Sequence, residues 1–205
     1  MTSLLSEVVP NTHHGALDYA ELERLGLEPD QVLDFSVNSN PFGPSPAVRD
    51  ALALVPLERY PDREALALRR ALATHLAVSV DQIVVGNGTA ELLSLVAQAF
   101  LRPGGRAFVV EPTFGEYKRV SRLVGADTRC WRSRPEDGFV PAPAQVSRAL
   151  DEADPDLAWI CNPNNPTGVV MSPEGLRLWA VAHPRMLLAT RRWLLACPMC
   201  WSSAP

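Results

Sequence analysis

Short apolar runs alternate with amphipathic segments along most of the chain. Strands are predicted at Ile83–Val85 and within 32–37, 106–111, 126–134 and 156–163. Helices are predicted within 17–27, 46–55, 66–78, 88–101, 115–126, 143–153 and 172–183, several of them with a Ser or Pro at the start. Strands that alternate with helices indicate an α/β domain with a largely parallel sheet.

Three turns follow strands of this predicted sheet, at 86–90, 111–115 and 161–168. In open parallel sheets, ligands bind beyond the carboxyl ends of the strands. We therefore expect these turns to converge on one site.

Composition narrows the classes of partner. The chain has 205 residues, 47% of them hydrophobic and 20% charged, and a net charge of −4. The acidic balance argues against nucleic acid and against an anionic membrane. No apolar run approaches the length of a transmembrane helix, and no signal peptide is recognisable, so a cytoplasmic protein is expected.

The four cysteines carry little chemical information. Cys130 and Cys161 are isolated and are predicted to be small buried hydrophobic residues. Cys197 and Cys200 form a C-x-x-C, which alone is a weak indication of redox or zinc chemistry.

The three turns have residue types that suit different parts of one ligand. Gly88, Thr89 and Ala90 begin a helix, where free N–H groups and the positive helix end favour a phosphate. Phe114 could stack on a planar ring, and the Asn165 amide could reach a ring hydroxyl. The alternatives are an ordinary strand-to-helix turn, an aromatic packed in the core, and a turn rich in Asn, Pro and Gly.

Five motifs in order carry a resemblance to a known family: DFSVNSNPFGP, RYPD, GNGTAEL, PTFGEY and NPNNPTG. The chain resembles the fold-type I pyridoxal-phosphate enzymes of the class I/II aminotransferases. The closest branch resembles histidinol-phosphate aminotransferase and threonine-phosphate decarboxylase. HHGALDY near the start leans toward the decarboxylase pattern, although Ala16 replaces a glycine. The similarity covers about residues 13 to 186.

The resemblance implies roles for particular residues and a pyridoxal 5′-phosphate cofactor. Backbone groups of Gly88, Thr89 and Ala90 would bind the cofactor phosphate. Phe114 would stack on its ring, and Asn165 would hydrogen-bond its 3-oxygen.

Three further residues would act at the edges of that site. Tyr60 would reach the cofactor of the partner subunit in a homodimer, and the alternative is a loop aromatic packed on its own chain. Asn38 and Asn40 would lie near a small phosphorylated amine or amino acid, and the alternative is turn chemistry around Pro41 and Gly43.

The implied fold is an incomplete three-layer α/β/α large domain with part of a small domain. Residues 1–59 would form an N-terminal arm and small-domain segment, 60–186 the cofactor-binding large domain, and 187–205 a tail unlike the family. Transamination is the first expectation for the reaction, and threonine-phosphate decarboxylation is the alternative.

The family's chemistry requires a lysine that forms a Schiff base with the cofactor. The chain has a single lysine, Lys118, at a helix position predicted to be solvated. The later Ser-x-[Ser/Thr]-Lys and Asp-Glu-Ala-Tyr stretches of the family have no match, so no catalytic residue is assigned. The chain alone is expected to be inactive.

The unusual end of the chain suggests a shift of reading frame near residues 187–193. In a shifted frame, the codons of PMCWSS can encode an apolar strand like the one that precedes the family's lysine. DNA sequence from codon 180 past the stop tests this hypothesis. The rival is a genuine shortened protein with its own tail. For the function, the alternatives to an enzyme fragment are a non-catalytic subunit, which would form a mixed dimer with an intact homologue, and an unrelated α/β protein.

Overall fold

The computed structural model describes residues 15–37, 40–182 and 187–190. The chain forms two compact units that meet in the sequence between Val85 and Gly86. We call them the N-terminal unit and the sheet unit, and each is described by itself.

The sheet unit contains a four-stranded parallel sheet in the order β2-β1-β3-β4. Its strands are β1 (Arg106–Glu111), β2 (Asp127–Arg132), β3 (Leu157–Ile160) and β4 (Leu187–Thr190). Its helices are α4 (Gly88–Phe100), α5 (Glu116–Leu123), η3 (Pro135–Asp137), α6 (Pro143–Ala153) and α7 (Pro173–Ala182). The predicted strands within 106–111, 126–134 and 156–163 are confirmed.

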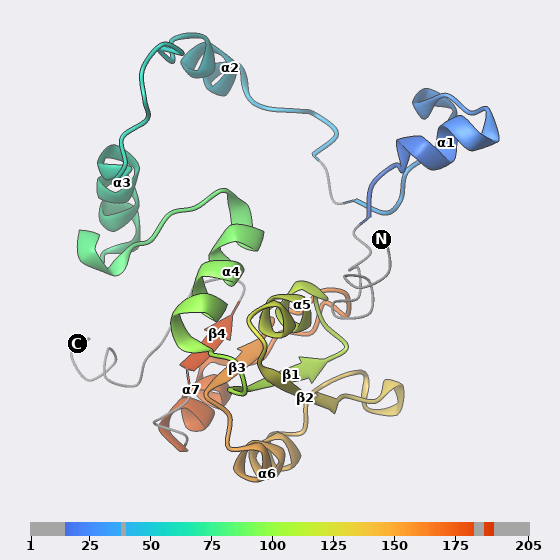
Figure 1. Ribbon diagram of the computed structural model, residues 1–205, viewed down its shortest axis with the longest axis vertical. Helices are drawn as coiled ribbons and strands as arrows, with labels where there is room; N and C mark the ends of the chain where they lie inside the picture. The colour runs from blue at the N-terminus through green and yellow to red at the C-terminus, as the bar shows by residue number, and fades with distance from the viewer. Residues whose placement is uncertain (1–14, 38–39, 183–186, 191–205) are drawn as a thin grey trace. The chain divides into compact units, whose positions relative to one another are not determined.

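Helices cover both faces of this sheet (Figure 1). Consecutive residues of β1 point to opposite faces, as strand geometry requires. Ala107 and Val109 pack with α4 and α5, whereas Phe108 and Val110 pack with α6 and α7. Both faces of β1 and β3 are therefore buried, which explains why these strands read as continuous apolar runs. The predicted three-layer α/β/α arrangement is confirmed.

The N-terminal unit is helical in the part that the structure describes. It contains α1 (Tyr19–Leu25), η1 (Pro29–Gln31), α2 (Pro46–Ala53), α3 (Leu66–Leu76) and η2 (Val80–Gln82). Ser45 caps α2 through its hydroxyl and Pro46 is the first helical residue, as predicted.

Two predicted strands are wrong. Ile83–Val85 has no strand partner among the described residues, although the backbone of Ile83 is extended. A strand requires a neighbour to complete its backbone hydrogen bonds, so an apolar run alone does not make one. Residues 33–37 also form no strand, because the Asp34 carboxylate accepts the Ser36 N–H at 2.7 Å and so favours a local turn.

The predictions for the cysteines are confirmed only in part. Cys161 is buried, as predicted, but Cys130 is exposed because it lies on β2, at the edge of the sheet. Cys197 and Cys200 lie outside the described residues, as does Asn38. No helix in the described ranges is both long and apolar enough to span a bilayer.

Candidate functional site

Asn164 connects the turns that follow β1 and β3. Its side-chain N–H group donates to the Pro112 carbonyl at 2.9 Å and to the Thr167 hydroxyl at 2.8 Å. Its side-chain oxygen accepts the Thr113 hydroxyl at 3.0 Å. Two of the three predicted turns, 111–115 and 161–168, are thus brought together directly.

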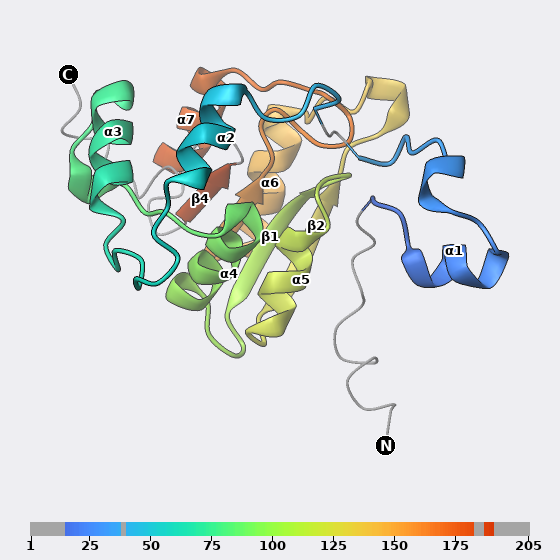
Figure 2. The ribbon, with the colours of Figure 1, turned by 90° about the horizontal axis from the view of Figure 1, so that it is seen from above.

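The third turn lies at the same edge of the sheet. Helix α4 runs antiparallel to β1, so its N-terminus lies toward the edge to which the strand arrows point (Figure 2). This arrangement agrees with the expectation that the three turns lie together at the carboxyl ends of the strands.

The two neighbouring asparagines of the 161–168 turn have different environments. The Asn162 side chain pairs with the backbone of Met171, accepting its N–H at 2.8 Å and donating to its carbonyl at 3.0 Å. Asn165 is half-buried, and its backbone N–H donates to the Cys161 sulfur at 3.4 Å. Its side-chain amide has no hydrogen bond to any residue that the structure describes. Asn165 alone of the three thus keeps its amide available for a ligand.

Phe114 is half-buried and packs at the edge of the core that contains α4 and α5. Its ring meets Tyr117 edge to face at a centroid distance of 6.0 Å, and Tyr117 stacks on Trp159 at 5.3 Å. The packing role that the sequence left open is therefore present. Partial exposure leaves room for a second contact.

The start of α4 carries the predicted phosphate-binding residues. Gly88 has a φ of 76°, a left-handed value that glycine adopts without strain. Gly88, Thr89 and Ala90 are all exposed. The Gly88 N–H donates to the Gly86 carbonyl at 2.8 Å and would have to leave that bond to reach a phosphate. The N–H groups of Thr89 and Ala90 lie in the first helical turn, where they have no acceptor within the helix, so they are suited to an anion.

A carboxylate lies close to this helix start, which the sequence did not indicate. Glu91 accepts the Asn87 backbone N–H through Oε2. A Cβ on Gly86 would come within 2.8 Å of that oxygen, so glycine allows the approach. Glu91 neutralises part of the positive helix end, but its carboxylate contacts Asn87, and residues 88–90 remain exposed. The position of Glu91 in the first turn of the predicted helix could have indicated this carboxylate in advance.

Three of the predicted site residues, Asn38, Asn40 and Tyr60, belong to the N-terminal unit. Asn40 accepts the Phe42 N–H at 3.1 Å and donates to the Gly43 carbonyl at 2.9 Å, which is the turn role. Tyr60 is exposed. The roles of Tyr60 at an interface and of Asn38 and Asn40 toward a substrate stay predictions.

Lys118 is ion-paired rather than solvated, contrary to the prediction. Its Nζ lies 2.6 Å from Glu111 Oε1, and Arg132 lies 3.0 Å from the other carboxylate oxygen. Burial raises the pKa of Glu111, but the hydrogen bonds from Lys118 and Arg132 outweigh it and hold the pKa below the ordinary value. The Glu111 contact raises the pKa of Lys118. Strand β1 and helix α5 bring these charges together, which spacing alone could not show.

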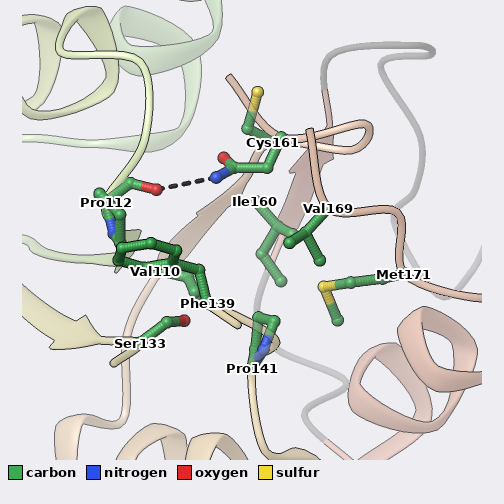
Figure 3. A pocket seen from close by; sticks show the side chains of 10 residues that line it. Val110, Pro112, Ser133, Phe139, Pro141, Ile160, Cys161, Val169 and Met171 are labelled. Atoms are coloured by element: carbon green, nitrogen blue, oxygen red, sulfur yellow. Dashed lines mark hydrogen bonds between the residues drawn. The ribbon is translucent and has the colours of Figure 1, made fainter. Parts of the chain in front are cut away.

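A small pocket borders the turns after β1 and β3, and part of its lining belongs to the core that contains α6 and α7 (Figure 3). Its lining is mainly apolar and includes Val110, Phe139, Ile160 and Met171. Its volume is ≈ 10 Å³, which is about the space of one water molecule. This pocket cannot take a cofactor, so the open edge near Phe114 and Asn165 is the better candidate site.

Comparisons with known proteins identify the family of the chain. Residues 30–188 match the family model described as aminotransferase class I and II, and this range contains every predicted site residue. Threonine-phosphate decarboxylase of Salmonella typhimurium is 41% identical over 177 residues, covering 84% of this chain and 46% of that protein. Histidinol-phosphate aminotransferase of Limosilactobacillus fermentum is 40% identical over 148 residues, covering 69% and 40%.

A solved structure shows the shared fold. Histidinol-phosphate aminotransferase of Sinorhizobium meliloti, in complex with pyridoxal-5′-phosphate, superimposes with a TM-score of 0.73 at 22% identity. The match covers 92% of this chain and 50% of that one. The chain therefore spans half or less of the length of these relatives.

Proposed function

This chain belongs to the class I and II aminotransferase family, and from that premise we propose that it binds pyridoxal 5′-phosphate at the carboxyl edge of its sheet. In this proposal the N–H groups of Gly88, Thr89 and Ala90 bind the phosphate. Phe114 covers one face of the pyridine ring, and the Asn165 side chain donates to the ring 3-oxygen.

The state of Asn165 is the observation that carries the proposal. Asn162 and Asn164 use their amides to hold the turn, whereas the Asn165 amide forms no hydrogen bond with the described residues. The Asn165 side chain is only half-buried, so its N–H groups can still donate to a ligand. Phe114 follows the Thr113–Asn164 contact directly, so an aromatic ring and a free donor lie on connected turns.

The bound cofactor would supply an electron sink for the amino-acid substrate. The residues of this chain bind and orient it, and no proton-transferring residue is assigned among them. Lys118 is engaged by Glu111 and is not proposed as the lysine that would hold the cofactor covalently.

This chain alone lacks the lysine that the reaction requires and is not expected to catalyse it. For the reaction to which its site belongs, we propose transamination of a small phosphorylated amine or amino acid, with decarboxylation as the second candidate. The two relatives named above act in these two ways and are about equally similar, at 40% and 41% identity. The longer match of the decarboxylase, over 177 residues against 148, supports keeping it. A cytoplasmic homodimer, Tyr60 at its interface, and substrate contacts from Asn38 and Asn40 complete the proposal.

Equilibrium titration of the chain with pyridoxal 5′-phosphate, followed by tryptophan fluorescence, tests the cofactor site. We expect saturable binding, and weaker binding of pyridoxal, which lacks the phosphate. Asn165→Ala removes one neutral hydrogen bond of about 1 kcal/mol, so Kd should rise about fivefold. Gln145→Ala, on the exposed side of α6, is the control and should leave Kd unchanged. Equal Kd values for Asn165→Ala and the unchanged chain would contradict the proposed contact.

The relative affinities for two substrates distinguish between the two candidate reactions. The cofactor-loaded chain is titrated with histidinol phosphate and with L-threonine O-3-phosphate. Tighter binding of the first supports the aminotransferase proposal, and tighter binding of the second supports the decarboxylase.

A further inference from the structure

The Asn164 side chain is engaged both within its own turn and across to the turn after β1. It makes three hydrogen bonds, to Pro112, Thr113 and Thr167, at 2.8 to 3.0 Å. Two of these partners belong to the turn after β1, which lies more than 50 residues earlier in the chain. Strands β1 and β3 are paired in the sheet, and the Asn164 amide adds a direct link between the two turns that follow them.

The contacts of Asn164 lie next to both proposed ring contacts. Thr113 precedes Phe114, and Asn164 precedes Asn165. Displacement of either loop would therefore change the distance between the Phe114 ring and the Asn165 amide. A planar ligand held by both residues is sensitive to that distance, because misplacement by about 1 Å weakens a built site.

The backbone of the second turn is held independently of this side chain. The Asn164 N–H donates to the Val169 carbonyl at 2.8 Å, and the Gly168 N–H donates to the Asn164 carbonyl at 2.8 Å. Loss of the side chain would leave these bonds in place. The Asn164 side chain is thus needed to join the turns rather than to form its own turn.

We propose that Asn164 is a positioning residue that holds Phe114 and Asn165 at the spacing the cofactor ring requires. This role rests on the proposed function, and it assigns to Asn164 no contact with the cofactor. Thr113 is its partner in the same role, acting through the hydroxyl that it donates to the Asn164 oxygen. Preorganisation of this kind raises affinity because the bound geometry costs less to reach.

The matched pair Thr113→Val and Thr113→Ser tests the proposal with little change in volume, and Asn164→Ala tests it more severely. Kd for pyridoxal 5′-phosphate should rise about tenfold in Asn164→Ala and about fivefold in Thr113→Val, and Thr113→Ser should restore the original value. In Asn164→Ala, the further change Asn165→Ala should cost less than the fivefold expected alone, because Asn165 is already misplaced. If Asn164 had a purely structural role, Asn164→Ala would lower the stability of the fold. The effects of Asn164→Ala and Asn165→Ala on Kd would then not be coupled, and Thr113→Ser would not restore Kd.

Hydrogen exchange of the cofactor-free chain gives a second readout. Asn164→Ala and Thr113→Val should both speed amide exchange in 112–115 and 164–168, and Thr113→Ser should not. If amide exchange in these turns, or Kd, is unchanged in folded Thr113→Val and Asn164→Ala, the positioning role of Asn164 is overturned and the proposed function still stands. Absence of saturable binding to the unchanged chain would overturn the proposed function, and with it the role of Asn164 toward the cofactor.

Discussion

Glu111 links the stability of the sheet unit to pH. The hydrogen bonds from Lys118 and Arg132 outweigh burial and lower its pKa, so the folded state favours the carboxylate. A group with a lowered pKa contributes stability that is complete above its ordinary pKa and is lost as pH falls through its folded pKa. The pKa of Lys118 is raised, so its contribution is complete below the ordinary lysine pKa and is lost as pH rises through the higher folded value.

We therefore predict that Glu111→Gln lowers the free energy of unfolding by about 1 kcal/mol at pH 7 and by less at pH 3. The loss shrinks in acid because the carboxyl of the unchanged chain becomes protonated there. Urea unfolding at the two pH values measures the difference. Glu136→Gln, in an exposed position on η3, is the control. An equal loss at both pH values would show that the ion pair is not its cause.

The same ion pair should protect Lys118 from modification. Covalent attachment of pyridoxal 5′-phosphate needs an uncharged amine, and the contact with Glu111 raises the pKa of Lys118. We predict that borohydride reduction labels Lys118 poorly in the unchanged chain and severalfold more in Glu111→Gln. Peptide mass spectrometry measures the label. Strong labelling of Lys118 in the unchanged chain would contradict this account.

At the residue scale, the sequence predicted which turns come together, but it did not predict which side chains within them form the connecting hydrogen bonds. The three asparagines of NPNNPTG look alike in a sequence, and all three suit a turn. Their different roles arise from Met171, Thr113 and Pro112, which the fold brings to them. Asn165 was a candidate because it precedes Pro166, which favours an extended backbone, and the family resemblance gave its amide a specific partner, the 3-oxygen of the cofactor.

Among the elements, hydrophobic pattern predicted the buried strands because both faces of β1 and β3 are covered by helices. It failed at Ile83–Val85, where the apolar residues have no strand partner among the described residues. Strand formation depends on a neighbour that can lie anywhere in the chain. Helices satisfy their own backbone, so their predicted positions agreed better with the structure.

One buried hydrogen bond connects helix α5 to strand β3. Trp159 Nε1 donates to the Ser121 hydroxyl at 2.9 Å, and Ser121 donates to the Tyr117 carbonyl at 2.8 Å. Both Ser121 and Trp159 are completely buried. Ser121→Ala would leave the indole N–H without its acceptor, which costs about 1–3 kcal/mol.

Thermal and urea unfolding of Ser121→Ala test this prediction against Ser94→Ala. Ser94 lies on α4 and makes a comparable bond to a helical carbonyl, but in an exposed position. We expect its loss to cost less than about 0.5 kcal/mol. Similar effects of the two changes would mean that the Trp159 bond adds little to the packing of α5 on the sheet.

At the scale of the whole molecule, the two units carry different predicted residues. The residues proposed to bind phosphate and ring all belong to the sheet unit, whereas Tyr60, Asn38 and Asn40 precede it in the N-terminal unit. A ligand that binds the native state stabilises it by about 2.7 kcal/mol at a concentration of 100 Kd. That stabilisation should appear first in the unit that holds the ligand.

We predict that pyridoxal 5′-phosphate slows amide exchange in the full chain at 86–90, 111–115 and 161–168, and leaves α1 unchanged. Amides that exchange only when the sheet unit unfolds should slow by about 100-fold at 100 Kd. Hydrogen exchange read by mass spectrometry measures each segment, with pyridoxal at the same concentration as the control for the phosphate. Protection confined to α1, or equal protection by pyridoxal, would place the phosphate contact elsewhere than the start of α4. Protection of all three turns together would show that they act as one site, which is what the shared edge of a parallel sheet requires.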